Sequence, residues 1–408
     1  MLILAYVKIL CMNNGLEELL SRSVKEIIPS KDALREALDS GKKLRIYIGT
    51  DATGQSLHLG HATNYMILER FRRLGHEVIF LIGDFTSRVG DPTDKSDSAR
   101  KPLSREEVVQ NTKTWIDQVR PIIDVDNKDN PVKIQYNHEW FSKLGVDDFL
   151  NIAYNFTVQQ MIERDMFQER IKAGLPLHLP ELLYPVMQGY DSVAMDVDME
   201  MCGNDQKFNA LAGRTLLKKL KNKEKFVFIT TLLENPVTKE KMMSKSKHTG
   251  VFLDWSAQNM FGGIMSQPDE NMKQLFTDCT RLSPEEIDEI LLQDNPKDVK
   301  IRLAFEITKI YHGEEAAKGA QKNFEDTFSK GGVPTNVDMI KVSTGTKLSD
   351  ALISQGIISS KTEWRRLISD GAITNAETGE KIKSPDEEVS ESITLKVGKH
   401  RFIRIEMQ

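Results

Sequence analysis

Apolar runs and amphipathic stretches alternate along the first part of the chain. Residues 42–50 (KKLRIYIGT) and 77–84 (EVIFLIGD) are runs of strand length, rich in β-branched and aromatic side chains. Between them, residues 59–74 have the apolar spacing of a helix, and Gly75 follows as a stop signal. A strand, a helix and a second strand in this order form a βαβ unit, so the pattern predicts a parallel sheet.

Three further apolar runs of strand length follow, at 131–137, 196–201 and 225–231. Helical stretches separate them, and the longest covers roughly residues 140–195. The pattern therefore predicts an α/β fold, in which a helical insertion interrupts an open, Rossmann-like parallel sheet.

The pattern changes after the last of these strands. From 256 to about 330 it is helical, and SPEEIDEILLQ opens with the Ser-x-x-Glu signature of a helix start. Residues 329–339 are rich in Gly, Pro and Asn, which is typical of a linker. A compact unit is expected after it. We therefore expect three parts, at residues 12–240, 241–335 and 345–408.

Composition is that of an ordinary soluble protein of two or three domains, with 408 residues, 39% hydrophobic and 28% charged. A net charge of −5 argues against nucleic-acid binding over the whole surface but leaves room for local basic surfaces. Three isolated cysteines favour a reducing cytoplasm. The apolar residues 1–11 contain Lys8 and are too short to span a bilayer. We interpret them as a dispensable extension rather than a signal peptide, and we expect no membrane association.

Two histidines lie three residues apart at the predicted start of the first helix, in the hexapeptide SLHLGH. Zinc-binding helices usually place two histidines four apart and need a third ligand, which nothing nearby supplies, so no metal site is predicted. The free N–H groups and dipole of a helix start favour an anion, and imidazoles can donate hydrogen bonds to it. Gly60, between His58 and His61, lets a ligand come close. A phosphate site and a pair of histidines that merely cap the helix both fit this stretch.

A second candidate is the loop KEKMMSKSKHTG (239–250), which follows the last predicted strand. Its lysines and hydroxyl groups can neutralise charge that develops on a leaving pyrophosphate. Taken alone, the loop is typical of a solvated basic surface. Its occurrence in one chain with the histidine pair favours a nucleotide site.

These stretches resemble the signatures of a known enzyme family. SLHLGH and MSKSK are similar to the HIGH and KMSKS motifs of class I aminoacyl-tRNA synthetases. YIGTDATGQSLHLGH, LIGDFTSRVGDPTDKS, YPVMQGYDSVAM, CGNDQKFN and FGGIMSQPD resemble tyrosyl-tRNA synthetases, in the family's order. The resemblance covers residues 12–408. It implies an enzyme that activates L-tyrosine with ATP and transfers the tyrosyl group to tRNA(Tyr). It also implies a homodimer, Mg²⁺ that accompanies ATP, and no tightly bound protein metal.

The resemblance assigns roles in the nucleotide site to single residues. His58, His61 and Thr53 would contact the ATP phosphates, and their work is positioning and electrostatics. Lys245 matches the second lysine of KMSKS, and Lys241 lies one residue before the place of the first. The other positions expected to bind ATP are Gly49, Asp51, Gly60, Gly203, Asp205, Ser244 and Ser246.

Specificity for tyrosine has its own physical requirement. To reject phenylalanine, a pocket must bury hydrogen-bonding groups that only a phenol satisfies. By resemblance, Tyr47 and Asp191 contact the substrate hydroxyl. The positions that match contacts to the α-amino and carboxyl ends of tyrosine are Asp91, Tyr184, Gln188 and Gln206. Each also has an ordinary structural interpretation, since Tyr47 ends a strand and Asp91 precedes a proline in a common type of turn.

The tail resembles an S4 RNA-binding domain, which implies a small α+β unit. The segments that carry this resemblance are TKLSDALISQGIISSKTEWRRLISDGAIT and LKVGKHRFIRIE. The expected RNA contacts are Lys361, Arg365 and Arg366 on a helix, with Lys399 and Arg401 on a terminal hairpin. Such charges would meet phosphates in a salt-dependent, largely sequence-blind manner. A solvated surface module is the alternative. The helical domain before the tail would meet the anticodon arm.

Two positions depart from the family's pattern. Met242 stands where most members have the first lysine of KMSKS, and this puts the activation rate in question. Cys202 stands where glycine is common, so its side chain could crowd the floor beneath the nucleotide. These departures leave a non-catalytic RNA-binding paralogue as an alternative. The tryptophanyl homologue would lack Tyr47 with Asp191, and other HxGH nucleotidylyltransferases would lack the tail and GNDQ.

Overall fold

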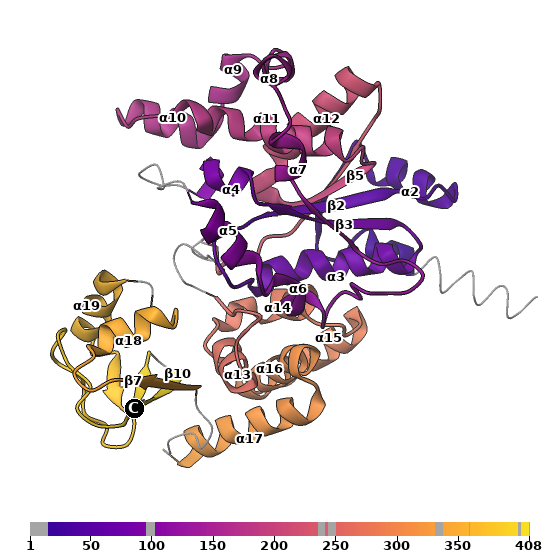
Figure 1. Cartoon of the computed structure of the whole chain (residues 1–408). Coiled ribbons are helices and arrows are strands. Elements are labelled where there is room, and N and C mark those ends of the chain that lie inside the picture. Colours follow the sequence, from indigo (N-terminus) through magenta and orange to yellow (C-terminus); the bar gives the residue numbers. More distant parts are fainter. Residues whose placement is uncertain are drawn as a thin grey trace, which may run out of the picture. The chain divides into compact units, whose positions relative to one another are not determined.

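The computed structural model describes residues 15–94, 103–235, 241–243, 250–330, 338–358, 360–398 and 401–407. Contacts divide the chain into two compact units, Met1–Leu232 and Leu233–Gln408 (Figure 1). The division falls a few residues before the boundary expected at 240.

A six-stranded sheet in the order β1-β6-β5-β2-β3-β4 forms the centre of the first unit. All neighbouring strands pair in parallel except β1, which is antiparallel to β6. The strands are β1 (Val24–Ile28), β2 (Arg45–Asp51), β3 (Glu77–Gly83), β4 (Lys133–Tyr136), β5 (Met199–Gly203) and β6 (Phe226–Thr230). The five strands predicted from apolar runs are confirmed. Strand β1 was not predicted because VKEII is a charged edge strand with a single buried residue.

Helices cover both faces of this sheet (Figure 1). On one face, α3 packs against β3, and its buried Tyr65 meets Phe80 edge-on at a centroid distance of 4.8 Å. On the other face, α12 packs against β5 and β6. The helices outside the insertion are α2 (Lys31–Asp39), α3 (Leu59–Arg73), α4 (Thr86–Val89), α5 (Arg105–Thr112), α6 (Trp115–Val119) and α12 (Lys207–Lys221), with short 3-10 turns η1 (Pro92–Asp94) and η2 (Asn204–Gln206).

The sheet reverses its strand order beside β2. The chain continues from β2 to β3 and β4 on one side and later places β5 and β6 on the other. In open α/β sheets, ligands bind at such a switch point, outside the carboxyl ends of the strands. Here these ends are Asp51 on β2 and Gly203 on β5.

The stretch between β4 and β5 is helical, as the sequence predicted. Its helices are α7 (His138–Phe141), α8 (Val146–Ala153), α9 (Val158–Ile162), α10 (Asp165–Lys172) and α11 (Leu179–Ala194). Helix α11 packs closely along α12 (Figure 1). Gly189 permits this approach, since a Cβ there would lie 3.0 Å from the backbone of Ala212 and Gly213. The close packing holds one long face of α11 against the sheet domain's core.

The second unit begins with helices and ends with a sheet. The helices are α13 (Ala257–Met265), η3 (Asp269–Asn271), α14 (Met272–Cys279), α15 (Pro284–Leu291), α16 (Pro296–His312) and α17 (Glu314–Lys330). The predicted start at SPEEIDEILLQ is confirmed: Ser283 and Glu286 cap α15 reciprocally, with distances of 3.2 and 2.7 Å.

A four-stranded sheet, β7-β10-β9-β8, forms the end of the chain around buried Trp364. Its elements are β7 (Asp338–Val342), α18 (Leu348–Ser354), α19 (Lys361–Ser369), β8 (Ile373–Asn375), β9 (Ile393–Val397) and β10 (Arg401–Met407). Strand β7 pairs in parallel with β10, so this sheet starts earlier than the expected boundary at 345. Within the described ranges, no helix is both long and apolar enough to cross a membrane.

Candidate active site

Tyr47 points from the middle of β2 into a buried polar network. Its hydroxyl lies 3.0 Å from Ser192 Oγ on α11. Lys225 donates to the same Ser192 Oγ at 2.9 Å and forms an ion pair with Glu200 on β5. Burial, together with the charges of Glu200 and Asp191, raises the pKa of Tyr47 well above its usual value. Tyr47 is therefore a neutral phenol at physiological pH.

Asp191 is the second expected contact to the substrate hydroxyl, and it is buried on α11 next to Ser192. Its Oδ1 accepts from Trp140 Nε1 at 2.9 Å, and its Oδ2 from Asn137 Nδ2 at 3.4 Å. Burial raises the pKa of Asp191 well above its usual value, and these two hydrogen bonds act in the opposite direction. Asn137 and Trp140 were not predicted from the sequence. Their position could have indicated a role, because Asn137 ends the predicted strand at 131–137 and Trp140 follows it closely.

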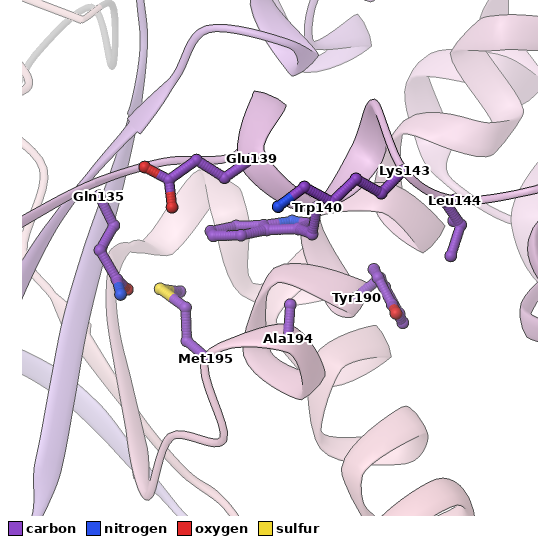
Figure 2. Close-up of a pocket in the computed structure, with 8 residues that line it drawn as sticks. All are labelled: Gln135, Glu139, Trp140, Lys143, Leu144, Tyr190, Ala194 and Met195. Carbon is purple, nitrogen blue, oxygen red and sulfur yellow. The ribbon is translucent and has the colours of Figure 1, made fainter.

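Trp140 also lines a pocket of about 460 Å³ (Figure 2). The indole of Trp140 lies in this pocket between residues of β4, α7 and α11. Its N–H donates the hydrogen bond to Asp191. The other lining residues are Gln135, Glu139, Lys143, Leu144, Tyr190, Ala194 and Met195.

Asp51, which the sequence assigned to ATP, contacts Tyr184, which it assigned to tyrosine. Its Oδ2 accepts from the Tyr184 hydroxyl at 2.9 Å, and its Oδ1 from Thr86 Oγ1 at 2.7 Å. Asn137 Nδ2 donates to the same Thr86 oxygen at 2.9 Å. Burial, and then the charges of Asp51 and Asp91, raise the pKa of Tyr184 well above its usual value. This chain of hydrogen bonds connects the end of β2 with the surroundings of Asp191.

A second chain connects the residues expected at the amino and carboxyl ends of the substrate. Gln206 Nε2 donates to Asp91 Oδ2 at 2.6 Å. Asn209 Nδ2 donates to Gln206 Oε1 at 2.9 Å and to Gln188 Oε1 at 3.0 Å. Gln188 Nε2 donates in turn to Glu200 Oε1 at 3.0 Å. Three expected residues are thus brought together through Asn209, a fully buried residue that sequence analysis did not single out.

Arg164 brings a positive charge to this acidic end. It donates to Thr93 Oγ1 at 2.9 Å and to Asn209 Oδ1 at 3.4 Å. Burial lowers the pKa of Arg164, and the charges of Asp91 and Asp205 act in the opposite direction. An arginine so placed can balance carboxylate charge around a bound ligand. It too escaped the sequence analysis, because nothing in its local pattern distinguishes it from a surface residue of the insertion.

The histidine pair lies at the start of α3, as predicted. His58 is the N-cap, and His61 Nδ1 accepts from the His58 backbone N–H at 3.2 Å. The two ring centroids are 3.8 Å apart. The capping contact that the sequence left open is thus present. Because Nδ1 of His61 is an acceptor, the proton of the neutral ring lies on Nε2, which is a donor suited to an anion.

The loop before the histidines is attached to α6. Leu57 donates its backbone N–H to Gln118 Oε1 at 2.7 Å, and Gln118 Nε2 donates to the Gln55 carbonyl at 2.9 Å. Thr53 donates its N–H to the Asp51 carbonyl at 2.8 Å. These contacts fix the path of the chain from the end of β2 to the start of α3.

The expected nucleotide floor at the end of β5 is built on Gly203. A Cβ there would lie 2.7 Å from Asp205 Oδ1, so the backbone can approach Asp205 only without a side chain. Cys202 is buried in an apolar cluster with Ala210, Val227 and Ile229. Its side chain therefore packs in the core. The remaining expected glycines, Gly49 and Gly60, lie at the end of β2 and in the first turn of α3.

The lysine-rich loop is described only at its two ends. At one end, Lys241 forms a β-bridge with Glu234. The side chain of Met243 is buried against Gly250 and Val251, and the Val251 N–H lies 3.3 Å from the Met243 sulfur. Both ends of the loop are thus held at one place. The expected nucleotide contacts Ser244, Lys245 and Ser246 lie outside the described residues.

The expected RNA contacts are only partly exposed. Arg365 and Arg366 are exposed on α19, and Lys361, at its start, pairs with Asp350 at 3.1 Å. Arg401 on β10 donates to the Ile357 carbonyl at 2.9 Å, so its guanidinium also serves the fold. Lys399 lies outside the described residues. In the part of the chain that is described, no three His, Cys, Asp or Glu side chains come together to hold a metal.

A sheet that is parallel except at one edge, with polar side chains gathered at its switch point, defines a protein of the Rossmann-like α/β class. A family model described as class I tRNA synthetases (W and Y) matches residues 39–329. The chain belongs to this family.

Several relatives cover nearly the whole chain. A tyrosine–tRNA ligase of Carboxydothermus hydrogenoformans is 39% identical over 403 residues, which are 95% of this chain and 97% of that protein. A tyrosine–tRNA ligase of Thermotoga maritima is 37% identical over 394 residues, with 95% and 96% covered.

Solved structures of tyrosyl-tRNA synthetases share the fold. A truncated mitochondrial enzyme of Coccidioides posadasii has a TM-score of 0.62 at 24% identity and covers 76% of this chain and 90% of its own. An Archaeoglobus fulgidus enzyme complexed with L-tyrosine has a TM-score of 0.58 at 20% identity, with 76% and 99% covered.

Proposed function

We propose that the protein is a tyrosine–tRNA ligase, which activates L-tyrosine with ATP to tyrosyl-adenylate and transfers the tyrosyl group to the 3′ end of tRNA(Tyr). One observation carries the proposal: a neutral phenol, Tyr47, and a carboxyl group, Asp191, are buried together beside the switch point. The relatives of that name, which match this chain almost from end to end, support it.

Tyr47 and Asp191 would hold the two sides of the substrate hydroxyl. A phenol has one proton to donate and lone pairs to accept with, so it can donate to Asp191 and accept from Tyr47. Phenylalanine would leave both buried groups without this partner, and such a loss discriminates strongly. Trp140 and Asn137 would keep Asp191 oriented through their hydrogen bonds to its two oxygens.

The other end of the amino acid would lie along the Gln206–Asn209–Gln188 chain. Asp91, Tyr184 and Gln188 would take the α-ammonium group, while Gln206 would lie beside the carboxylate. One carboxylate oxygen then forms a bond to the α-phosphorus, the bond from that phosphorus to the bridging oxygen breaks, and diphosphate leaves. Holding these atoms in line supplies much of the rate.

The start of α3 would bind the phosphates. His61 can donate from Nε2, and His58 and Thr53 would complete the contacts around the helix start. Lys245 would neutralise charge on the diphosphate, with Lys241, Ser244 and Ser246 in the same loop. The nucleotide's sugar and base would lie over Gly49, Asp51, Gly60, Gly203 and Asp205.

Mg²⁺ enters the proposal only as a companion of ATP. The described residues form no cluster that holds a metal by themselves. Mg²⁺ keeps several waters and is commonly held by phosphate oxygens with one or two carboxylates, which suits a metal that arrives with the nucleotide.

Exposed apolar side chains of the insertion support a homodimer. Five large apolar side chains are exposed on helices α8, α9 and α11 or directly after α8, namely Val146, Leu150, Tyr154, Val158 and Leu179. An exposed apolar surface is typical of a protein interface. We infer that a second copy of the chain covers them in the cytoplasm.

We assign three functional parts: a catalytic domain at 12–240, an α-helical domain for the anticodon arm at 241–335, and an S4 domain at 345–408. The exposed Arg365 and Arg366 on α19 support RNA binding by the last part. Phosphates are the natural partners of such exposed guanidinium groups.

Tyrosine-dependent exchange of labelled diphosphate into ATP tests the proposal. We expect exchange with tyrosine alone among the twenty amino acids, transfer to tRNA(Tyr), and loss of exchange in Asp191→Ala. Exchange with tryptophan would assign the protein to the other branch of the family. RNA binding without exchange would make it a non-catalytic paralogue.

A further inference from the structure

Three buried polar residues lie beneath the proposed tyrosine cleft and have no role in the scheme above. They are Lys225, directly before β6, Glu200 on β5 and Ser192 on α11, and none is more than 1% exposed. Lysine and glutamate are almost never fully buried unless they are paired, and burying such a pair costs desolvation energy. A buried pair is therefore poor evidence for stability, and its position calls for another explanation.

Glu200 reaches both ends of the cleft through its two oxygens. Oε1 accepts from Gln188 Nε2 at 3.0 Å, at the end proposed for the α-ammonium group. Oε2 is bound by Lys225 and lies 3.4 Å from Ser192 Oγ, which also lies 3.0 Å from the Tyr47 hydroxyl. One carboxylate thus binds Gln188 at the amine end and is linked through Ser192 to Tyr47 at the phenol end.

Lys225 limits the directions that the hydrogen bonds in this group can take. An ammonium can only donate, so the contact of 2.9 Å makes Ser192 Oγ an acceptor from Lys225. Ser192 has one proton of its own, and its two acceptors are Tyr47 at 3.0 Å and Glu200 at 3.4 Å. When Ser192 donates this proton to Tyr47 rather than to Glu200, the Tyr47 hydroxyl accepts from the protein and has its own proton left for a substrate oxygen.

The surrounding packing leaves room for the ammonium and for little else. Gly213 on α12 faces it, and a Cβ at that position would lie 2.5 Å from Lys225 Nζ and 2.7 Å from Ser192 Oγ. The ammonium also lies 6.0 Å from the centroid of the Tyr47 ring. The pair is therefore enclosed on its α12 side as well as by the sheet.

We propose that Lys225, Glu200 and Ser192 form a positioning unit that orients the Tyr47 hydroxyl as a donor and the Gln188 amide for the amine, and so determines selectivity for tyrosine over phenylalanine. The inference rests on the proposed function, because it requires that the cleft binds tyrosine. None of the three residues touches the substrate; they act through Tyr47 and Gln188.

Ser192→Ala is the first test, because it removes the relay and leaves the ion pair intact. The measurement is diphosphate exchange with tyrosine and with phenylalanine, together with KM for ATP. We expect the ratio of kcat/KM for the two amino acids to fall about tenfold, KM for tyrosine to rise, and KM for ATP to stay within about twofold.

Lys225→Met is the second test, with Lys223→Met as the matched control. Lys223 lies two positions earlier, is more exposed, and pairs with Asp196 and Asp198 at 3.4 and 3.3 Å, away from the Tyr47 network. Only Lys225→Met should lower selectivity. Since it leaves Glu200 buried without its cation, the double variant Lys225→Met with Glu200→Gln is measured as well, and thermal melting identifies the folded variants.

Different results would refute the positioning unit and the proposed function. Folded Ser192→Ala and double variants that both retain the parent's selectivity would overturn the positioning unit while the parent still activates tyrosine. A parent chain with no tyrosine-dependent exchange would instead remove the proposed function.

Discussion

Removal of one oxygen atom, by Tyr47→Phe, tests the tyrosine cleft most directly. The hydroxyl contacts Ser192 at 3.0 Å on the protein side and, in our proposal, the substrate phenol on the other. The substitution conserves the ring, which is 1% exposed and packed in the core, so the shape of the cleft should be retained. Ser192 keeps Lys225 and Glu200 as partners, so the variant leaves no protein group without a hydrogen bond.

The expected effect follows from the hydrogen bonds that change. With tyrosine as substrate, one neutral hydrogen bond is lost, which costs about 1 kcal/mol, or about fivefold in kcat/KM. With phenylalanine, the parent enzyme buries a hydroxyl that has no ligand partner, and the variant relieves about 1 kcal/mol of that cost. The ratio of the two kcat/KM values should therefore fall by about 2 kcal/mol, or about thirtyfold.

Diphosphate exchange with each amino acid at saturating ATP gives both values. Tyr65→Phe is the matched control, since Tyr65 is also fully buried and its hydroxyl lies 3.1 Å from Thr50 Oγ1 on the protein side. The control should lose stability but keep the selectivity of the parent. If Tyr47→Phe and the parent select equally well, the hydroxyl does not contact the substrate and the assignment of the cleft is wrong.

Three other variants test other parts of the molecule. His61→Ala should lower kcat of exchange about 100-fold with little change in KM for tyrosine, because it removes a phosphate donor; a rise in KM for tyrosine alone would contradict this. Asp191→Asn tests the pH dependence of stability. In urea unfolding between pH 4 and 8, the parent should lose stability relative to the variant as pH rises, because burial raises the pKa of Asp191 and the folded state therefore binds this proton more tightly than the unfolded state does. Equal slopes of the unfolding free energy against pH in the two proteins would refute this. The double variant Arg365→Glu with Arg366→Glu should weaken tRNA binding and flatten its salt dependence, while exchange without tRNA is unchanged. Equal tRNA affinity of the variant and the parent in filter binding would exclude this face of α19 as an RNA-binding surface.

Local sequence determined the elements whose apolar or capping pattern lies within a short stretch of the chain. The apolar runs at β2, β3 and β6 and the helical spacing of α3 were sufficient, because burial on both faces of a parallel strand leaves a continuous hydrophobic signature. The capping pair Ser283 and Glu286 marked the start of α15 for the same local reason, since the contact spans three residues. Strand β1 carries no such signature, because its position at the edge of the sheet leaves most of its residues solvated.

Strand order decided the hydrogen-bond partners in the candidate site. Lys225 stands in KNKEKFVFITT among lysines that look like surface residues, and only the pairing of β6 with β5 buries it beside Glu200. Asn209 and Trp140 joined the network in the same way, from helices far from Tyr47 in the sequence. Periodicity is a property of neighbours along the chain and can be seen in the sequence. Hydrogen-bond partners at a sheet's switch point come from separate elements, and only the folded chain brings them within reach of one another.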